Sequence, residues 1–291
     1  APNTPGPNAA QAKTQSPAPP VSAAPMASAA TPSDVDKPQY QSPNNPDAFA
    51  LIIGIDKYKG LPEAEFAARD AAAVREHLRA LGYPERNTIY LEGPNATRSG
   101  MESYLDEWLP RNVRPESTVF FYYSGHGAPD AKTGEAYLVP WDADVKFLKT
   151  TAYPVKKLYA SLEKLKVKGV IVARDACFSG AGGHSVLPKG ARPLVTKVDE
   201  GFAPQGNMVL FAAASSDEIT STLEDKGHGI FTYYFLQGLS GAAKGKDGQV
   251  TAKELYDYLL PKVQDEARRQ NREQTPKLLP ASGIQAGLIL R

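Results

Sequence analysis

The fold and its chemistry are decided by one stretch, Gly169-Val170-Ile171-Val172-Ala173-Arg174-Asp175-Ala176-Cys177-Phe178-Ser179-Gly180. Its β-branched run predicts a buried strand, and Ser179-Gly180 predicts the turn that ends this strand. Cys177 is the only cysteine of the chain, and it would lie at the carboxyl end of the strand, where open α/β sheets usually place their chemistry. The thiol is therefore either a nucleophile or a buried structural cysteine, which is common.

Outward from this stretch, short apolar runs alternate with helical patterns. The runs predict strands at 48–55, 88–91, 118–123, 137–140 and 208–214, and the helical patterns lie at about 62–81, 98–108, 155–165, 231–239 and 251–269. Repeated alternation of this kind predicts a three-layer α/β/α sandwich with a mostly parallel central sheet.

Composition restricts the classes of function. The 291 residues are 42% apolar, which is enough for one large core or two small ones. A net charge of +1, from 33 basic and 32 acidic residues, indicates no nucleic-acid or membrane-surface patch. No apolar run approaches the ~20 residues of a transmembrane helix. A single cysteine excludes an internal disulfide framework and a four-thiolate metal site.

Residues 1–47 differ from the rest of the chain. They hold eleven of the 25 prolines and one aromatic residue, Tyr40, and show no hydrophobic period. Such a segment predicts a disordered linker or pro-segment, followed by one folded domain over 48–291. The chain begins at Ala1, which favours a removed signal peptide and an exported protein, although a trimmed cytoplasmic chain stays open.

A cysteine nucleophile needs an acid–base partner, normally histidine. His126 directly follows a predicted buried strand between Gly125 and Gly127, so it would lie at the same edge of the sheet as Cys177. The other three histidines fit less well, since one is predicted on a helix surface and two in loops: His77, His184 and His228. The alternative for His126 is a histidine that caps a turn.

Asp70 lies on the apolar stripe of the helix predicted at 62–81, between Phe66 and Val74. An unpaired charge on a core-facing side is costly to bury. Asp70 therefore either leans out to pair with Arg69 or Arg75, or has a function in a site.

Two motifs carry a family resemblance: Tyr122-Tyr123-Ser124-Gly125-His126-Gly127 and Asp175-Ala176-Cys177-Phe178-Ser179-Gly180. Together they resemble the caspase-like cysteine peptidases, and the histidine precedes the cysteine by 51 residues, close to the ~50 of the caspase signature. Asp-Ala-Cys-x-Ser-Gly replaces the Gln-Ala-Cys of true caspases, and is similar to metacaspases and their prokaryotic relatives, the orthocaspases.

This resemblance implies a His126–Cys177 dyad and an oxyanion hole made by the backbone N–H groups of Gly127 and Cys177. It also implies that Asp70 and Asp175 line the S1 pocket, which holds the residue before the scissile bond (P1). Two acids there would attract Arg or Lys and repel an acidic P1 residue. We expect further lining from Ser124, Ser215 and Ser216, whereas Asp217 and Glu224 are either additional S1 acids or surface acids.

Residues 181–206 read as an exposed loop between a large part, 48–180, and a small part, 207–291. Self-cleavage after Lys189 or Lys197 is expected if S1 is acidic; otherwise the basic residues only keep the loop soluble. Several metacaspases need calcium, and Asp130 and Asp142 fall near such positions, but the acid expected soon after the cysteine motif is absent. Because calcium needs several oxygen ligands, we expect no strong metal site and no cofactor.

The sequence thus predicts a cysteine endopeptidase acting on peptides or proteins with Arg or Lys at P1. The alternative is a catalytically weak caspase-fold module that binds or scaffolds. A third possibility is an unrelated flavodoxin-like domain that binds an anion, but residues 54–60 lack the spacing of a phosphate-binding loop.

Overall fold

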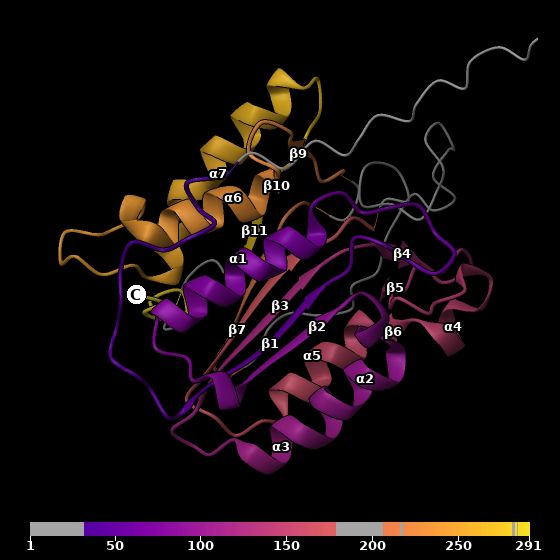
Figure 1. The fold of residues 1–291 in the computed structure, drawn as a ribbon, viewed down its shortest axis with the longest axis horizontal. Helices are drawn as coiled ribbons and strands as arrows, with labels where there is room; N and C mark the ends of the chain where they lie inside the picture. The colour runs from indigo at the N-terminus through magenta and orange to yellow at the C-terminus, as the bar shows by residue number, and fades with distance from the viewer. Residues whose placement is uncertain (1–31, 179–205, 216–217, 281–282, 284) are drawn as a thin grey trace, which may run out of the picture. The chain divides into compact units, whose positions relative to one another are not determined.

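The computed structural model describes residues 32–178, 206–215, 218–280, 283 and 285–291. Six strands form one sheet in the order β11-β8-β7-β3-β1-β2, and only β11 runs antiparallel to its neighbour. These strands are β1 (Ala48–Gly54), β2 (Thr88–Glu92), β3 (Thr118–Ser124), β7 (Gly169–Asp175), β8 (Met208–Ala212) and β11 (Lys277–Leu279). The predicted mostly parallel sheet is confirmed (Figure 1).

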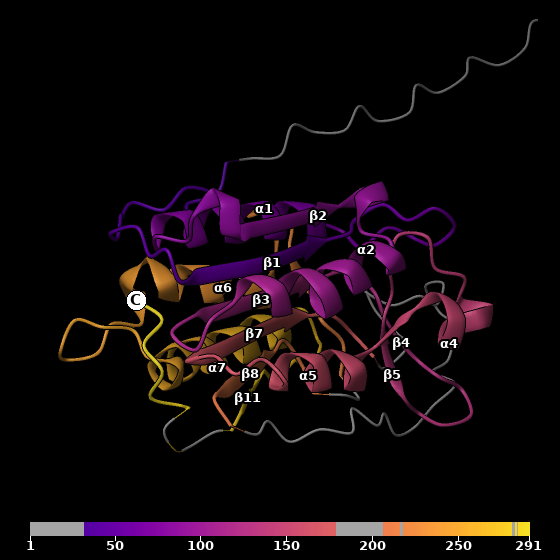
Figure 2. The same cartoon turned by 90° about the horizontal axis from the view of Figure 1, so that it is seen from below.

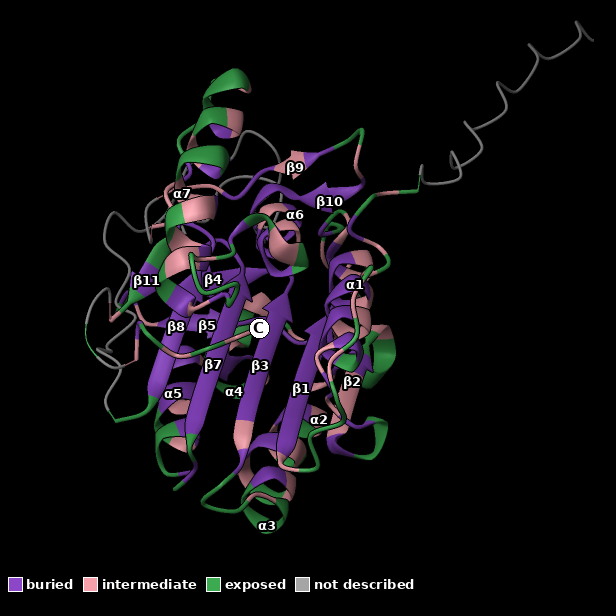
Figure 3. Cartoon of the chain, turned by 90° about the vertical axis from the view of Figure 1, so that its left-hand side faces the viewer, coloured by how far each residue is buried: buried purple, intermediate pink, exposed green. Residues whose placement is uncertain are grey.

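Helices cover both faces of the sheet, which completes the three layers (Figure 1); in Figure 2 the strands are spread out in sheet order behind one of the helix layers. One layer holds α1 (Ala67–Ala80), α6 (Ile230–Gln237) and α7 (Ala252–Arg269), and the other holds α2 (Arg98–Glu102), α3 (Leu109–Asn112) and α5 (Val155–Glu163). A hydrophobic core lies between the sheet and each helix layer, and alternate residues of β1 point into one core or the other. Ala50 and Ile52 pack in the core of the first layer, and Leu51 and Ile53 pack in the core of the second. Strands β1 and β7 are therefore buried on both sides (Figure 3).

Smaller elements follow the carboxyl ends of the strands. An antiparallel sheet comes after β3, formed by β4 (Gly127–Pro129), β5 (Ala136–Leu138) and β6 (Tyr153–Pro154), and α4 (Leu148–Thr151) precedes β6. A second antiparallel pair joins β9 (Thr222–Leu223) to β10 (His228–Gly229), just before α6. Of these strands only β5 was expected, from the apolar run at 137–140; the others have two or three residues and are too short to show a period.

The first helix begins later than predicted, at Ala67 instead of about residue 62. Phe66 has a left-handed backbone, with φ of 67°, and such a residue cannot continue a right-handed helix. Residues 62–66 therefore form a loop, which leaves the carbonyl of Pro62 available to another partner.

Part of the segment assigned to a linker packs on the domain. Val35 is buried in the first core, and His77 of α1 bonds to the Val35 carbonyl and the Tyr40 hydroxyl. Composition did not predict these contacts, because it averages over the whole segment, whereas a few anchoring side chains are enough to hold a short Pro-rich segment on the domain. Residues 1–31 lie outside the described part of the chain.

Candidate active site

The loops that carry His126 and Cys177 lie side by side. Strands β3 and β7 are parallel neighbours, with Ser124 opposite Asp175, and Gly125 N donates to the Asp175 carbonyl at 3.2 Å. His126 and Cys177 each come two residues after this paired position. The buried strands and their turn residues thus bring both candidate side chains to one edge of the sheet, as the sequence predicted.

Gly127 shows how closely the two loops approach. A Cβ at this position would collide with the carbonyl oxygen of Cys177 and would lie 2.8 Å from the Phe178 ring. Only glycine leaves room for such an approach. The glycine after the histidine is therefore required by contact with the cysteine loop.

His126 is buried and held from two sides. Its Nε2 donates to the Pro62 carbonyl at 2.7 Å, and its backbone N–H donates to the Tyr58 hydroxyl at 2.7 Å. The Tyr58 and His126 rings stack, with centroids 4.6 Å apart and an interplanar angle of 25°. A carbonyl can only accept, so Nε2 carries hydrogen, and Nδ1 is the nitrogen through which a neutral His126 exchanges a proton.

Cys177 is covered by a segment that the sequence did not single out. Its side chain lies at the protein interior, in a residue only 1% exposed. Thr220 N donates to Sγ at 2.7 Å, Thr220 Oγ1 lies 3.2 Å from Sγ, and the thiol donates to the Glu218 carbonyl at 3.8 Å. Burial raises the pKa of Cys177 to about 11, although the Thr220 bonds act in the opposite direction. The group is therefore a neutral thiol near pH 7.

Two side chains hold the segment Glu218–Ser221 over the thiol. The Glu218 carboxylate accepts from Ser215 N at 3.1 Å and from Thr275 N at 2.6 Å. The Gln274 side chain accepts from Ser221 N at 2.9 Å and donates to the Ala213 carbonyl at 3.0 Å. No local pattern marks these residues, because their partners come from distant parts of the sequence.

Asp70 and Asp175 meet at Gly229, the last residue of β10. A Cβ built on Gly229 would lie 2.7 Å from Asp175 Oδ2 and 3.0 Å from Asp70 Oδ2. Both acids are buried. The structure therefore brings the two predicted carboxylates together, although they are far apart in the sequence.

Each acid has its own hydrogen-bond donors. Asp175 Oδ2 accepts from Thr232 Oγ1 at 2.8 Å. Asp70 accepts from Gly229 N at 3.1 Å and faces His228 Nδ1 at 2.7 Å. Arg69, one of the expected partners of Asp70, instead forms an ion pair with Asp36 at 2.8 Å. The acid on the apolar stripe is thus buried among polar groups, which lowers the cost of its charge.

Comparison with known proteins now assigns the fold and the motifs to a family. A family model described as the caspase domain matches residues 47–282. The chain belongs to this family. Metacaspase-2 of Trypanosoma brucei brucei is 22% identical over 275 residues, which cover 81% of this chain and 73% of the relative. A probable protease of a Desulfuromonadales bacterium is 24% identical over 253 residues, which cover 76% of this chain and 30% of that protein.

A solved structure supports the same fold. The crystal structure of a Geobacter sulfurreducens protein matches with a TM-score of 0.55 at 16% identity, covering 83% of this chain and 99% of the other. The chain is thus a caspase-family peptidase domain, and the distant similarity to metacaspases agrees with its Asp-Ala-Cys motif. Membership in a peptidase family implies protein substrates.

The remaining predicted residues of the caspase domain fall in different places. Ser124 is buried at the end of β3, Ser215 is half-buried, and Glu224 is exposed and accepts from Thr222 Oγ1 at 2.8 Å. The other candidates of the S1 pocket, the loop and the histidine set lie outside the described residues: Ser216, Asp217, Lys189, Lys197 and His184.

The two candidate calcium acids bond to the protein itself. Asp130 accepts from Thr133 N at 2.8 Å and from Lys132 N at 3.0 Å, and the Thr133 bonds hold its pKa below the usual range. Asp142 accepts from Arg98 N at 3.1 Å. Among the residues with described placement, no group of three or more His, Cys, Asp or Glu side chains could hold a metal ion.

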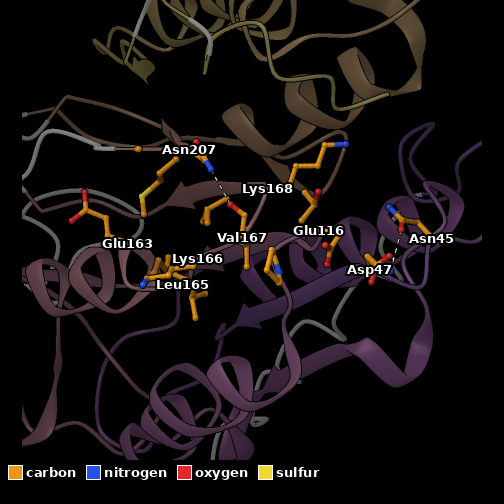
Figure 4. A pocket seen from close by; sticks show the side chains of 15 residues that line it. Asn45, Asp47, Glu116, Glu163, Leu165, Lys166, Val167, Lys168 and Asn207 are labelled. Carbon is orange, nitrogen blue, oxygen red and sulfur yellow. Dashed lines mark hydrogen bonds between the residues drawn. The ribbon is translucent and has the colours of Figure 1, made fainter.

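A hollow of about 1230 Å³ lies at the other end of the parallel strands from His126 and Cys177 (Figure 4). It is lined by the first residues of β3, β7 and β8, among them Thr118, Val170 and Met208. This is the amino edge of the parallel strands, opposite to His126 and Cys177, so the hollow is not part of the candidate active site. Across the described ranges, no helix is long and apolar enough to cross a membrane.

Proposed function

We propose that this caspase domain is a cysteine endopeptidase that cleaves after Arg or Lys, with Cys177 as nucleophile and His126 as acid–base partner. The supporting observation is the juxtaposition at one sheet edge. The His126 and Cys177 loops touch at Gly127, and the carboxylates of Asp70 and Asp175 meet at Gly229. A peptidase with a basic-P1 pocket needs its nucleophile, its acid–base partner and its pocket acids close together in this way.

The chemistry assigns one role to each group. His126 Nδ1 takes the proton of the Cys177 thiol, the thiolate so formed attacks the scissile carbonyl carbon, and the amine then leaves with that proton from Nδ1. Water activated by His126 then hydrolyses the thioester and restores the thiol. The bond from Nε2 to the Pro62 carbonyl fixes the ring and its tautomer during both transfers. Backbone N–H groups of Gly127 and Cys177 stabilise the oxyanion, and such a donor typically contributes on the order of 10²–10³ in rate.

The acids give the specificity. A guanidinium or ammonium group that reaches the Asp70 and Asp175 carboxylates gains charge-assisted hydrogen bonds, while an acidic P1 residue is repelled. Ser124, Ser215 and Ser216 complete the lining in this proposal.

The test is a set of fluorogenic peptides that differ only at P1, carrying Arg, Lys, citrulline or Asp. Citrulline is the decisive comparison, because it has the shape of arginine without the charge. We expect turnover in the order Arg or Lys, then citrulline, with Asp last, and no turnover by Cys177→Ala. Equal turnover of the arginyl and citrullyl peptides would refute the acidic pocket, and activity in Cys177→Ala would refute the nucleophile.

We also propose self-processing in the loop 181–206, after Lys189 or Lys197, since an acidic S1 pocket would accept both. Intact-mass measurements on wild type and Cys177→Ala test this. Fragments ending at Lys189 or Lys197 are expected only in wild type; fragments of the same mass in Cys177→Ala would point to another protease.

One observation favours a second function, a caspase-fold binding module with weak catalysis. The thiol is buried beneath Thr220, and burial raises its pKa to about 11. An arginyl-ketone probe separates the two functions, because it labels Cys177 only if the pocket and the nucleophile act together. Labelling under reducing conditions, with and without calcium, supports the peptidase, and its absence supports the binding module.

A further inference from the structure

His228 lies between two carboxylates, in a position that the sequence did not suggest. Its Nδ1 is 2.7 Å from Asp70 Oδ1 and its Nε2 is 3.0 Å from Asp36 Oδ1. The side chain is fully buried, as is that of Asp70, whereas the side chain of Asp36 is 28% exposed. Carboxylate oxygens lie next to both ring nitrogens, so His228 bridges Asp70 and Asp36.

Arg69 holds the other side of Asp36. Its Nε and one Nη donate to the Asp36 carboxylate at 3.2 and 2.8 Å. A chain of polar contacts therefore runs from Arg69 through Asp36 and His228 to Asp70.

The backbone around His228 is fixed by the β9–β10 pair. It pairs with Leu223 across the β9–β10 ladder, and the next residue, Gly229, donates its backbone N–H to the same Asp70 carboxylate at 3.1 Å. The His228 ring and this N–H therefore fix the orientation of Asp70 from the same strand. Asp36, in the segment before β1, holds the far side of the ring.

We infer that His228 is a positioning residue of the basic-P1 pocket, an inference that rests on the proposed function. It keeps the Asp70 carboxylate oriented, and Asp36 keeps His228 in place. Asp36 thereby links the segment before the first strand to the specificity of the site.

Two substitutions separate the two ring nitrogens. Asparagine places an amide N–H near the position of Nδ1, so His228→Asn keeps a donor to Asp70, whereas His228→Gln places its amide near Nε2 and loses that donor. The readout is the ratio of kcat/KM for an arginyl peptide to that for its citrullyl analogue. We expect His228→Gln to lower this ratio about tenfold, mainly through KM of the arginyl peptide. We expect His228→Asn to restore part of the loss.

Two further variants control for damage to the fold. His77→Gln alters another buried histidine that holds the same segment, through Val35 and Tyr40, but it contacts neither S1 acid, so its ratio should equal that of wild type. Asp36→Asn changes a partly exposed side chain and should lower the ratio about threefold, through loss of one charged bond. If His228→Gln does not fold, the ratio measured for Asp36→Asn tests the role of His228.

The outcomes distinguish this inference from the proposed function. A wild type without preference for arginyl over citrullyl peptide overturns the proposed function and this inference with it. A wild type with that preference, together with ratios within about twofold of wild type in Asp36→Asn and in any folded His228→Gln, overturns only the role of His228.

Discussion

Gly229→Ala would place a methyl group between the two acids of the proposed S1 pocket. The backbone at Gly229 has φ −62° and ψ 140°, a conformation open to any residue. The substitution therefore acts only through space. Its Cβ would lie 2.7 Å from Asp175 Oδ2 and 3.0 Å from Asp70 Oδ2, whereas ordinary contact begins at 3.4 Å.

The size of the effect follows from these distances. Both carboxylates must retreat by several tenths of an ångström, which stretches the bonds of Asp175 to Thr232 and of Asp70 to His228. Overpacking of this kind costs about 1–3 kcal/mol of stability. A lost hydrogen bond to a charged group costs about 1.5–3 kcal/mol, so kcat/KM for an arginyl peptide should fall by about tenfold or more, mostly through KM.

Steady-state kinetics with arginyl and citrullyl peptides, together with thermal melting, measure both effects. Gly60→Ala is the matched control, because a Cβ there meets nothing within 4 Å. We expect Gly60→Ala to behave as wild type and Gly229→Ala to lose its preference for arginine. If folded Gly229→Ala has the same KM for the arginyl peptide as Gly60→Ala, Asp70 and Asp175 do not bind the P1 side chain.

Three further predictions concern the dyad and the stability of the domain. Gly127→Ala should abolish turnover and lower Tm, because its Cβ overlaps the Cys177 carbonyl; unchanged kinetics would contradict the contact between the two loops. Alkylation of Cys177 by iodoacetamide should quicken about tenfold per pH unit up to about pH 10, since burial raises the thiol pKa to about 11; a plateau near pH 8.5 would mean an exposed thiol. Burial lowers the pKa of His77 from 6.5 to about 4, so the free energy of unfolding should be highest above pH 6.5 and decline as pH falls from there toward 4. Urea melts at several pH values measure this decline, which should be smaller in His77→Gln.

The sequence could place His126 and Cys177 because the relevant signals are local. Each residue closely follows a buried apolar strand, with glycines beside His126 and Ser179-Gly180 soon after Cys177, and parallel neighbours end at one edge of a sheet. Strands β3 and β7 are such neighbours. The pairing of Asp70 with Asp175 came only from the family resemblance, and the structure adds the physical contact at Gly229.

What the sequence could not predict depends on contacts between distant residues. Thr220 on Cys177 and His228 between Asp70 and Asp36 have no local pattern, since tertiary packing alone creates these contacts. Asp36 was assigned to a linker because composition averages over a segment and overlooks single anchors. Strand β11 was missed because three residues carry no measurable period.

The cover over Cys177 leads to a final prediction. A substrate carbonyl reaches Sγ only after Glu218–Ser221 moves, because Thr220 contacts the sulfur through both N–H and hydroxyl. Gln274 resists this movement through the bond that its side chain accepts from Ser221 N, worth about 1 kcal/mol net, while its second bond anchors the amide to the Ala213 carbonyl outside the segment. One such bond amounts to a factor of about 5 in the open population, and kcat/KM scales with that population.

Gln274→Ala should therefore raise both kcat/KM and the alkylation rate of Cys177 by about fivefold at fixed pH. Glu224→Ala is the control, because Glu224 is exposed on the neighbouring hairpin and bonds only locally, to Thr222. A parallel rise in both rates identifies movement of the segment as a step before catalysis. A rise in alkylation alone would show that the opened segment also positions substrate, and no rise in either rate would show that Gln274 does not hold the segment closed.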